Sequence, residues 1–149
     1  MEMAMTLKSI MSGAKPTTAK KRSTMSVNTL DREVLTSLRL IMEEDFAALL
    51  NAWWQDAGEK MAQLHEAVRN DDHDAVRRTA HSLKGSGSNL GLLALNAVCQ
   101  EIESTATSMN LASEATGHML VNLQQSINAS AQALQEETGV ILIGANFSG

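Results

Sequence analysis

The clearest hydrophobic pattern in the chain runs from residue 46 to residue 68. Apolar residues recur there at steps of three and four, at Phe46, Leu50, Trp53, Ala57, Met61, Leu64 and Val68. Because an α-helix has about 3.6 residues per turn, this spacing places them on one face. The acidic run at residues 43–45 comes just before, where negative charge favours the positive end of a helix dipole. The pattern predicts a long amphipathic helix.

Shorter segments on either side show the same periodicity. A short helix is expected near residues 30–41, with Asn28 or Thr29 as its N-cap. A turn at residues 70–74 leads into a second long helix, and Gly91 separates that helix from a third, at about residues 92–109. A last helix begins at Asn110 or Ser113. Each of these four helices has one apolar face. In chain order, from the short N-terminal helix to the last helix, the faces consist of Leu30, Val34, Leu35, Leu38 and Ile41; Val76, Ala80, Leu83, Gly87 and Leu90; Leu95, Val98, Ile102 and Met109; and Met119, Leu123, Ile127, Ala131 and Leu134.

These helices are joined by short connections, which implies antiparallel neighbours. The predicted fold is therefore all-α, an up-down antiparallel four-helix bundle with a short extra N-terminal helix, over residues 28–138. Residues 1–27 hold five basic residues, one acidic residue and the only proline, and are expected to form a disordered basic tail. Met25 is an alternative start of the natural chain. The short apolar tail at 139–149 is either a strand-like flap or a contact with another chain.

Composition removes several classes of function. The 149-residue chain is 44% hydrophobic, and none of its apolar runs approaches the roughly 20 residues that span a bilayer. Its single cysteine, Cys99, excludes an internal disulfide and favours a reducing compartment, so we expect the protein in the cytoplasm. A net charge of -5, with the basic residues concentrated at the N-terminus, argues against nucleic acid as the main partner. We also expect no membrane association and a monomer.

The stretch AHSLKGSGSNLG, at residues 80–91, carries the candidate chemistry. On a helical wheel His81 points away from the apolar face of its own helix. Three cations and two small residues lie within about 60° of it. These neighbours are Arg77, Arg78, Lys84, Gly85 and Ser88. The sequence thus predicts a solvent-exposed histidine beside positive charge and open space.

This arrangement suits phosphoryl transfer. A neutral imidazole nitrogen is a nucleophile, and an exposed histidine is largely neutral at pH 7. Neighbouring cations can stabilise an anionic group attached to it. A glycine inside a helix destabilises it by about 1 kcal/mol relative to alanine. The glycine next to the lysine is therefore better explained by access for a partner surface than by helix stability.

The same stretch resembles the signature of histidine-containing phosphotransfer (HPt) domains, a His-x-x-Lys-Gly pattern with a downstream Leu-Gly. The matching residues are His81, Lys84, Gly85, Leu90 and Gly91. The resemblance implies a four-helix bundle that accepts a phosphoryl group from a receiver-domain aspartate, often on a hybrid sensor kinase, and passes it to a response regulator. It makes His81 the phosphorylated residue and Lys84 its charge partner.

The resemblance also implies the partner surface and the cofactor requirement. Gly85 would keep the docking surface open, and Arg77 and Arg78 would contact the acidic receiver site, with Ser88 on the same surface. The chain itself would need no cofactor, because Mg²⁺ belongs to the receiver. Some members bond the imidazole through a glutamine of the next helix, and Gln100 is the candidate here.

Other residues have simpler structural explanations. Gly87, on the buried face, either loosens the helix or admits a neighbour closely. His65, His73 and His118 form no metal-ligand pair, and the aspartates at 71, 72 and 74 are explained by helix capping. Trp53 is expected in the core, Trp54 at the bundle edge or the docking face, and Cys99 buried.

Two alternatives to a stand-alone phosphotransfer protein remain. The first is a helical adaptor that binds a partner without phosphate chemistry. The second is a phosphotransfer module from a larger sensor kinase. The sequence has no phosphate-binding loop of the Gly-x-x-x-x-Gly-Lys-[Ser/Thr] type, so we expect no ATP binding and no autonomous kinase activity.

Overall fold

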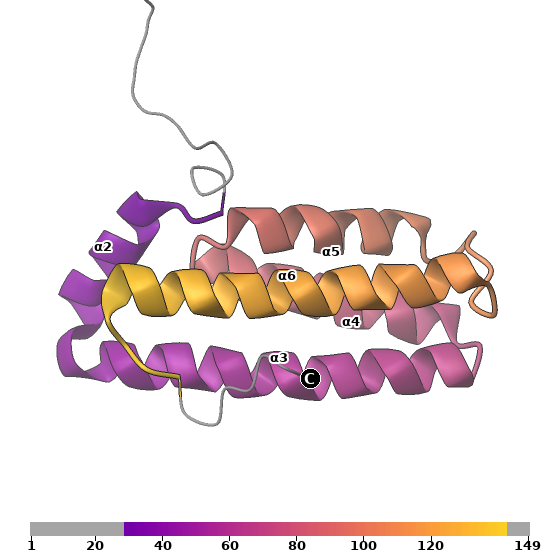
Figure 1. Ribbon diagram of the computed structural model, residues 1–149, viewed down its shortest axis with the longest axis horizontal. Helices are drawn as coiled ribbons and strands as arrows, with labels where there is room; N and C mark the ends of the chain where they lie inside the picture. The colour runs from indigo at the N-terminus through magenta and orange to yellow at the C-terminus, as the bar shows by residue number, and fades with distance from the viewer. Residues whose placement is uncertain (1–28, 143–149) are drawn as a thin grey trace, which may run out of the picture.

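Four long helices lie side by side in the computed structural model, which describes residues 29–142 (Figure 1). The order is α2 (Arg32–Met42), the 3-10 turn η2 (Glu43–Asp45), α3 (Phe46–Arg69), α4 (His73–Asn89), α5 (Leu93–Thr105) and α6 (Glu114–Thr138). Helices α3 to α6 form the bundle, and α2 lies across one end. The predicted all-α, up-down four-helix bundle with an extra N-terminal helix is confirmed. The chain at 1–27 lies outside the described residues.

Side-chain caps fix where three of the helices begin. The Asp31 side chain accepts hydrogen bonds from two first-turn amides of α2. In the same way, the Asp72 side chain accepts from the Ala75 amide at the start of α4, and the Ser113 side chain accepts from the Thr116 amide at the start of α6. The prediction that Asn28 or Thr29 caps α2 is therefore wrong, because Leu30 is held extended by a bridge to Leu92. Helix α5 also ends at Thr105 rather than near residue 109.

The core contains most of the predicted apolar faces, including all five positions of α4. On α3 and α6 one buried position differs by one residue from the predicted apolar face. Ala67 is buried where Val68 was expected, and Leu120 is buried where Met119 was expected. Ile41 was placed on the inner face of α2, yet 75% of it is exposed. Since α2 crosses the end of the bundle, only one narrow side of it reaches the core.

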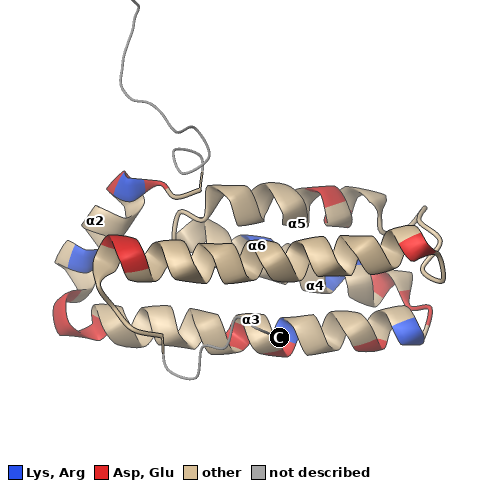
Figure 2. Ribbon diagram, viewed as in Figure 1, with Lys and Arg blue, Asp and Glu red and all other residues tan. Residues whose placement is uncertain are grey.

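Helix α2 is held against the last turn of α6. Arg39 donates to the Thr138 carbonyl oxygen at 2.7 Å, and Arg32 pairs with Glu137 at 2.8 Å. Figure 2 shows basic positions on α2 next to an acidic stretch at the end of α6. The guanidinium of Arg39 also lies over the Phe46 ring. These contacts join the two ends of the described chain.

The described part of the C-terminal tail, residues 139–142, packs on the bundle. Gly139 ends α6 with φ of +78°. The Leu142 amide then donates to Gln135, and the Leu142 side chain is buried. No strand forms in these four residues, and the rest of the tail lies outside the described residues.

Several residues outside the motif lie as the sequence predicts. Trp53 is buried and Trp54 is half-buried beside it, with the ring centroids 6.2 Å apart. A Cβ at Gly87 would come within 2.4 Å of the Asn96 side chain, so this glycine admits a neighbour closely. Within residues 29–142, no helix is long and apolar enough to cross a lipid bilayer.

Cys99 should be unreactive toward thiol reagents in the folded protein. It is fully buried in α5, and burial raises the pKa of its thiol to about 12, so the reactive thiolate is scarce. A chromogenic disulfide reagent should titrate one thiol in denaturant and almost none in native buffer. Rapid native labelling would contradict this burial.

Candidate functional site

His81 lies near the middle of α4, on the side opposite the core. The residues one position before it and two after it, Ala80 and Leu83, are fully buried. The His81 side chain is 65% exposed. The helical wheel therefore oriented this histidine correctly, and its imidazole is open to an approaching protein.

The imidazole is bonded by a residue that the sequence analysis missed. His81 Nδ1 lies 2.8 Å from Glu103 Oε2, across the interface with α5. Lys84 Nζ lies 2.7 Å from Glu103 Oε1 and donates to Gln100 Oε1 at 2.7 Å. The prediction that Gln100 bonds the imidazole is thus wrong, because Gln100 holds the lysine instead.

The register of two antiparallel helices explains why Glu103 meets His81. Besides the Lys84–Glu103 pair, side-chain hydrogen bonds join α4 to α5 at regular intervals: Ser88 with Asn96, Lys84 with Gln100, and His81 with Glu103. Steps of four and three residues along α4 are matched by the same steps along α5. The three pairs are centred on residue 92, whereas a hairpin centred on Gly91 would pair residue 81 with residue 101. The partner of His81 therefore depends on the offset between the two helices, which the sequence alone does not give.

Glu103 is ionised at neutral pH. The contact from the Lys84 ammonium has the largest effect, and the hydrogen bond from His81 has the next largest. Both lower the pKa of the Glu103 carboxyl below its usual range. An ionised carboxylate only accepts hydrogen bonds, so His81 Nδ1 carries the proton and donates it to Glu103. In the neutral ring this leaves Nε2 unprotonated, with its lone pair free to react.

The three predicted cations are present, but none of them is unpaired. Arg77 binds Asp74 at 2.7 Å and Arg78 binds the same carboxylate at 3.0 Å. Asp74 lies one turn earlier on α4, and the hydrogen bond from Arg77 lowers its pKa. The surface around His81 is therefore less positive than the sequence predicted, since Asp74 and Glu103 offset two of the three charges.

The two small residues of the motif occupy different surroundings. A Cβ at Gly85 would meet nothing within 4 Å, so the surface beside the imidazole is open there, as predicted. Ser88 is exposed, and its hydroxyl accepts a hydrogen bond from Asn96 at 3.1 Å. Both lie on the His81 side of α4.

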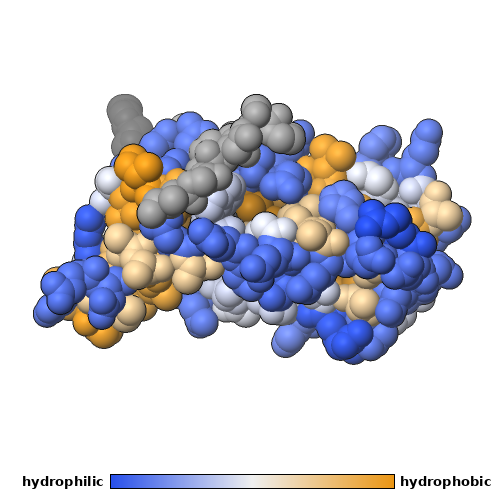
Figure 3. Space-filling model, turned by 90° about the horizontal axis from the view of Figure 1, so that it is seen from below, coloured by the Kyte–Doolittle hydropathy of each residue, from blue (hydrophilic) through white to orange (hydrophobic). Residues whose placement is uncertain are grey.

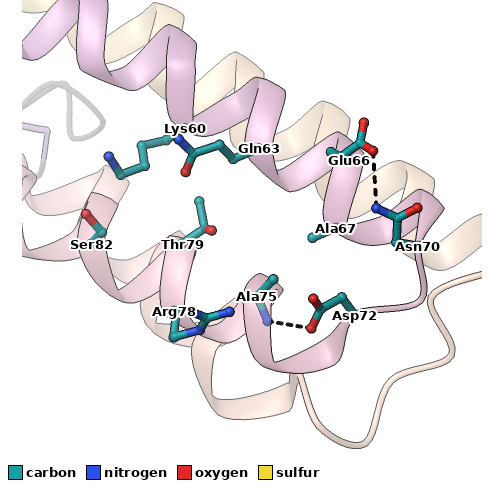
Figure 4. Close-up of a pocket in the computed structure, with 10 residues that line it drawn as sticks. All are labelled: Lys60, Gln63, Glu66, Ala67, Asn70, Asp72, Ala75, Arg78, Thr79 and Ser82. Atoms are coloured by element: carbon teal, nitrogen blue, oxygen red, sulfur yellow. Dashed lines mark hydrogen bonds between the residues drawn. The ribbon is translucent and has the colours of Figure 1, made fainter.

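A groove of about 420 Å³, lined mainly by polar residues, lies between α3 and α4 (Figure 4). Arg78 and Ser82 line it from α4, and Lys60 and Gln63 face them from α3. A second groove, of about 480 Å³ and mainly apolar, lies nearer α2 and includes Leu38, Leu49 and Leu90 in its lining. Figure 3 shows hydrophobic side chains gathered at the end of the molecule that carries α2.

The other histidines of the described chain have separate surroundings. Across residues 29–142, no group of three or more His, Cys, Asp and Glu side chains could hold a metal ion. His73 instead bonds the Ala106 carbonyl oxygen through Nδ1, at 2.8 Å, while His65 and His118 are exposed.

Comparison with known proteins identifies the family. A sequence model of the Hpt domain matches residues 48–136, which is more than half of the chain and includes the His81 motif. The chain belongs to the Hpt domain family. HPt proteins are phosphotransfer intermediates that interact with receiver domains, and this HPt protein is accordingly a histidine phosphotransfer protein of a phosphorelay. The adaptor alternative, without phosphate chemistry, is not favoured.

A solved structure supports the same assignment for this HPt protein. The chain is similar to histidine-containing phosphotransfer protein B (HptB) from Pseudomonas aeruginosa PAO1, with 30% sequence identity and a TM-score of 0.66. The similarity covers 73% of this chain and 93% of HptB. No curated protein sequence matches the chain.

Proposed function

We propose that His81 Nε2 accepts the phosphoryl group of the phosphorelay and that Lys84 stabilises it. The observation that carries this proposal is the orientation of an exposed imidazole, whose Nδ1 is held by Glu103 while Nε2 is free. A nucleophile held in place in this way needs little reorganisation when a phosphorylated partner docks.

The transfer exchanges one bond to phosphorus for another. The Nε2 lone pair forms the N–P bond while the P–O bond to the receiver aspartate breaks, and the aspartate leaves as a carboxylate. The ammonium of Lys84 lies one helical turn from His81 and its side chain is 26% exposed, so it can offset the phosphoryl charge. Mg²⁺ bound to the receiver would offset phosphoryl charge from the other side, and we propose no cofactor on this chain.

We propose that the donors are receiver domains of hybrid sensor kinases and that the acceptors are response regulators. Gly85 and Ser88 leave the approach to His81 open, and the arginines Arg77 and Arg78 face the same side. To contact an acidic receiver site, the arginines would exchange Asp74 for the receiver carboxylates. We further propose a cytoplasmic monomer that binds neither nucleic acid nor membranes, in keeping with its acidic composition and single cysteine. Because the sequence has no phosphate-binding loop motif, we also propose that it does not bind ATP.

The test is a phosphotransfer profile against every receiver domain of the source organism. Radiolabelled phosphoryl receivers should transfer label to the purified protein, and the label should be stable in base and labile in acid. Mass spectrometry should place it on the peptide that contains His81. Label on another peptide, or no label from any receiver, would refute the proposal.

Replacing Lys84 by alanine should slow transfer about tenfold or more and shorten the phosphohistidine lifetime. The loss of one charge-assisted contact of about 1.5–3 kcal/mol in the transition state accounts for this range. The thermal unfolding midpoint should fall only slightly, because a partly exposed ion pair such as Lys84–Glu103 contributes about 1 kcal/mol at most. Quench-flow transfer assays measure the rate, and unchanged transfer and lifetime would remove Lys84 from the mechanism.

A further inference from the structure

We propose that Asp74 weakens the binding of receiver domains by occupying the two arginines that a receiver carboxylate would contact. The inference rests on the proposed function, since it concerns the partner surface around His81. It gives an affinity-setting role to a residue in the first turn of α4, outside the His-x-x-Lys-Gly motif. Donor and acceptor both approach His81, so the protein must release one before it binds the other, and weaker binding favours this exchange.

Asp74 offers one carboxylate oxygen to each arginine. Its Oδ1 lies 2.7 Å from Arg77 Nη2, and its Oδ2 lies 3.0 Å from Arg78 Nε. A guanidinium that is bound in this way has fewer donors left for a carboxylate of another protein. The side chains of Asp74 and Arg78 are each 62% exposed and that of Arg77 is 42% exposed, so both pairs can open and exchange partners.

Asp74 also lies on the side of α4 from which a receiver approaches. It comes seven residues before His81, so it lies about two turns away along the helix and about 20° from the direction of the imidazole. On the same wheel Arg77 and Arg78 lie about 40° to one side of His81 and about 60° to the other. The carboxylate is thus between the two arginines. An acidic receiver site meets this negative charge directly, and the repulsion adds to the loss of donors.

Helix capping does not account for Asp74. The N-cap of α4 is Asp72, whose side chain accepts from the Ala75 amide. The side-chain oxygens of Asp74 contact Arg77 and Arg78 instead. What Asp74 gives to the helix itself is a negative charge near the positive end of the dipole. A control variant must therefore remove a charge from the same position of another helix.

Two substitutions and one altered background separate these effects. Asp74→Asn removes the negative charge and keeps the size of the side chain. Glu114→Gln is the matched control, because Glu114 is an exposed carboxylate in the first turn of α6, which packs against α3 and α5. Asp74→Asn is also made in a background with Arg77→Gln and Arg78→Gln, which lacks the two cations. Circular dichroism and thermal unfolding check that each variant is folded.

The first measurement uses inorganic phosphate as an anion probe of the free protein, at constant ionic strength. The Nε–H signals of Arg77 and Arg78 report its binding by NMR. Their initial change per millimolar phosphate should be about threefold or more larger in Asp74→Asn than in wild type and Glu114→Gln, because no carboxylate of the chain competes. No receiver is involved, so this result is independent of the role of His81. Equal responses in Asp74→Asn and wild type would overturn the proposal.

The second measurement is the affinity for the receiver that the phosphotransfer profile identifies, by isothermal titration calorimetry at several salt concentrations. At low salt Asp74→Asn should bind about three- to tenfold more tightly than wild type, since two exposed ion pairs no longer have to break. The gain should shrink as NaCl is added, because salt screens exposed charges. It should also be much smaller in the background without Arg77 and Arg78, while Glu114→Gln should bind like wild type.

Two outcomes of the calorimetry contradict the role of Asp74. The first is an affinity of Asp74→Asn no higher than that of Glu114→Gln, which would mean that the carboxylate does not compete with the receiver. The second is an equal gain with and without the two arginines, which would mean that Asp74 does not act through them. A merely structural role of Asp74 would change the unfolding midpoint but not the salt dependence of binding.

Discussion

Replacing His81 by glutamine should abolish phosphoryl acceptance from any phosphorylated receiver. The glutamine amide nitrogen has its lone pair delocalised into the carbonyl, so it offers no nucleophile at the position of Nε2. The fold should be intact, because the His81 side chain is largely exposed and contributes nothing to the core. The measurement is radiolabel transfer from a phosphorylated receiver, with circular dichroism as the check on folding.

His65→Gln on α3 is the matched control for this experiment, because His65 is also an exposed histidine within a helix. It should accept phosphate at the wild-type rate. The same receiver should still bind His81→Gln, so lost transfer is a loss of chemistry and not of docking. Phosphate that remains on His81→Gln, stable in base and labile in acid, would mean that another histidine carries the reaction.

Gly91→Val should produce the largest loss of stability among the single substitutions considered, about 3 kcal/mol or more. Gly91 has φ of +73°, a conformation that costs a residue with a Cβ roughly 1–2 kcal/mol and a β-branched residue more. A Cβ there would also lie 3.0 Å from the Asp31 carbonyl oxygen and 3.1 Å from the Val34 Cβ.

The crowding at Gly91 has no easy relief. The Asp31 amide donates to the Gly91 carbonyl oxygen at 2.8 Å, so the two backbones are tied together at the contact. Either the α4–α5 turn changes conformation or α2 moves away. Because this turn also sets the register that brings α5 to His81, phosphoryl transfer should slow in the same variant.

Urea unfolding followed by circular dichroism measures the effect of Gly91→Val. The control is Gly58→Ala on α3, where an added Cβ meets nothing within 4 Å. It should stabilise the protein by up to about 1 kcal/mol, as expected for alanine in a helix interior. If Gly91→Val were as stable as wild type, the tight contact between α2 and the α4–α5 turn would be wrong.

Local patterns predicted the parts of the site that lie on one helix. The direction of His81 followed from the apolar spacing of α4 alone, because a helix places residues three and four apart on one face. The pairing of Asp74 with the two arginines was equally local, at spacings of three and four, and was overlooked because the cations were considered without their neighbours.

Errors arose wherever an element meets another at an angle or at its end. The exposure of Ile41 depends on how α2 crosses the bundle, and periodicity within eleven residues says nothing of a crossing angle. The cap at Asp31 depends on the bridge between Leu30 and Leu92, which are 62 positions apart in the chain. Neither contact leaves a local signature.

The sequence by itself determined the class of fold, the helix carrying the motif and the outward direction of its histidine, since each depends on the repeat of a single helix. Only the tertiary structure decided that Glu103, and not Gln100, bonds the imidazole, and that Lys84 is bound by both. The physical reason is that these contacts are made between helices. Their choice depends on the rotation and offset of α5 against α4, and a shift of one helical turn would change which side chains meet.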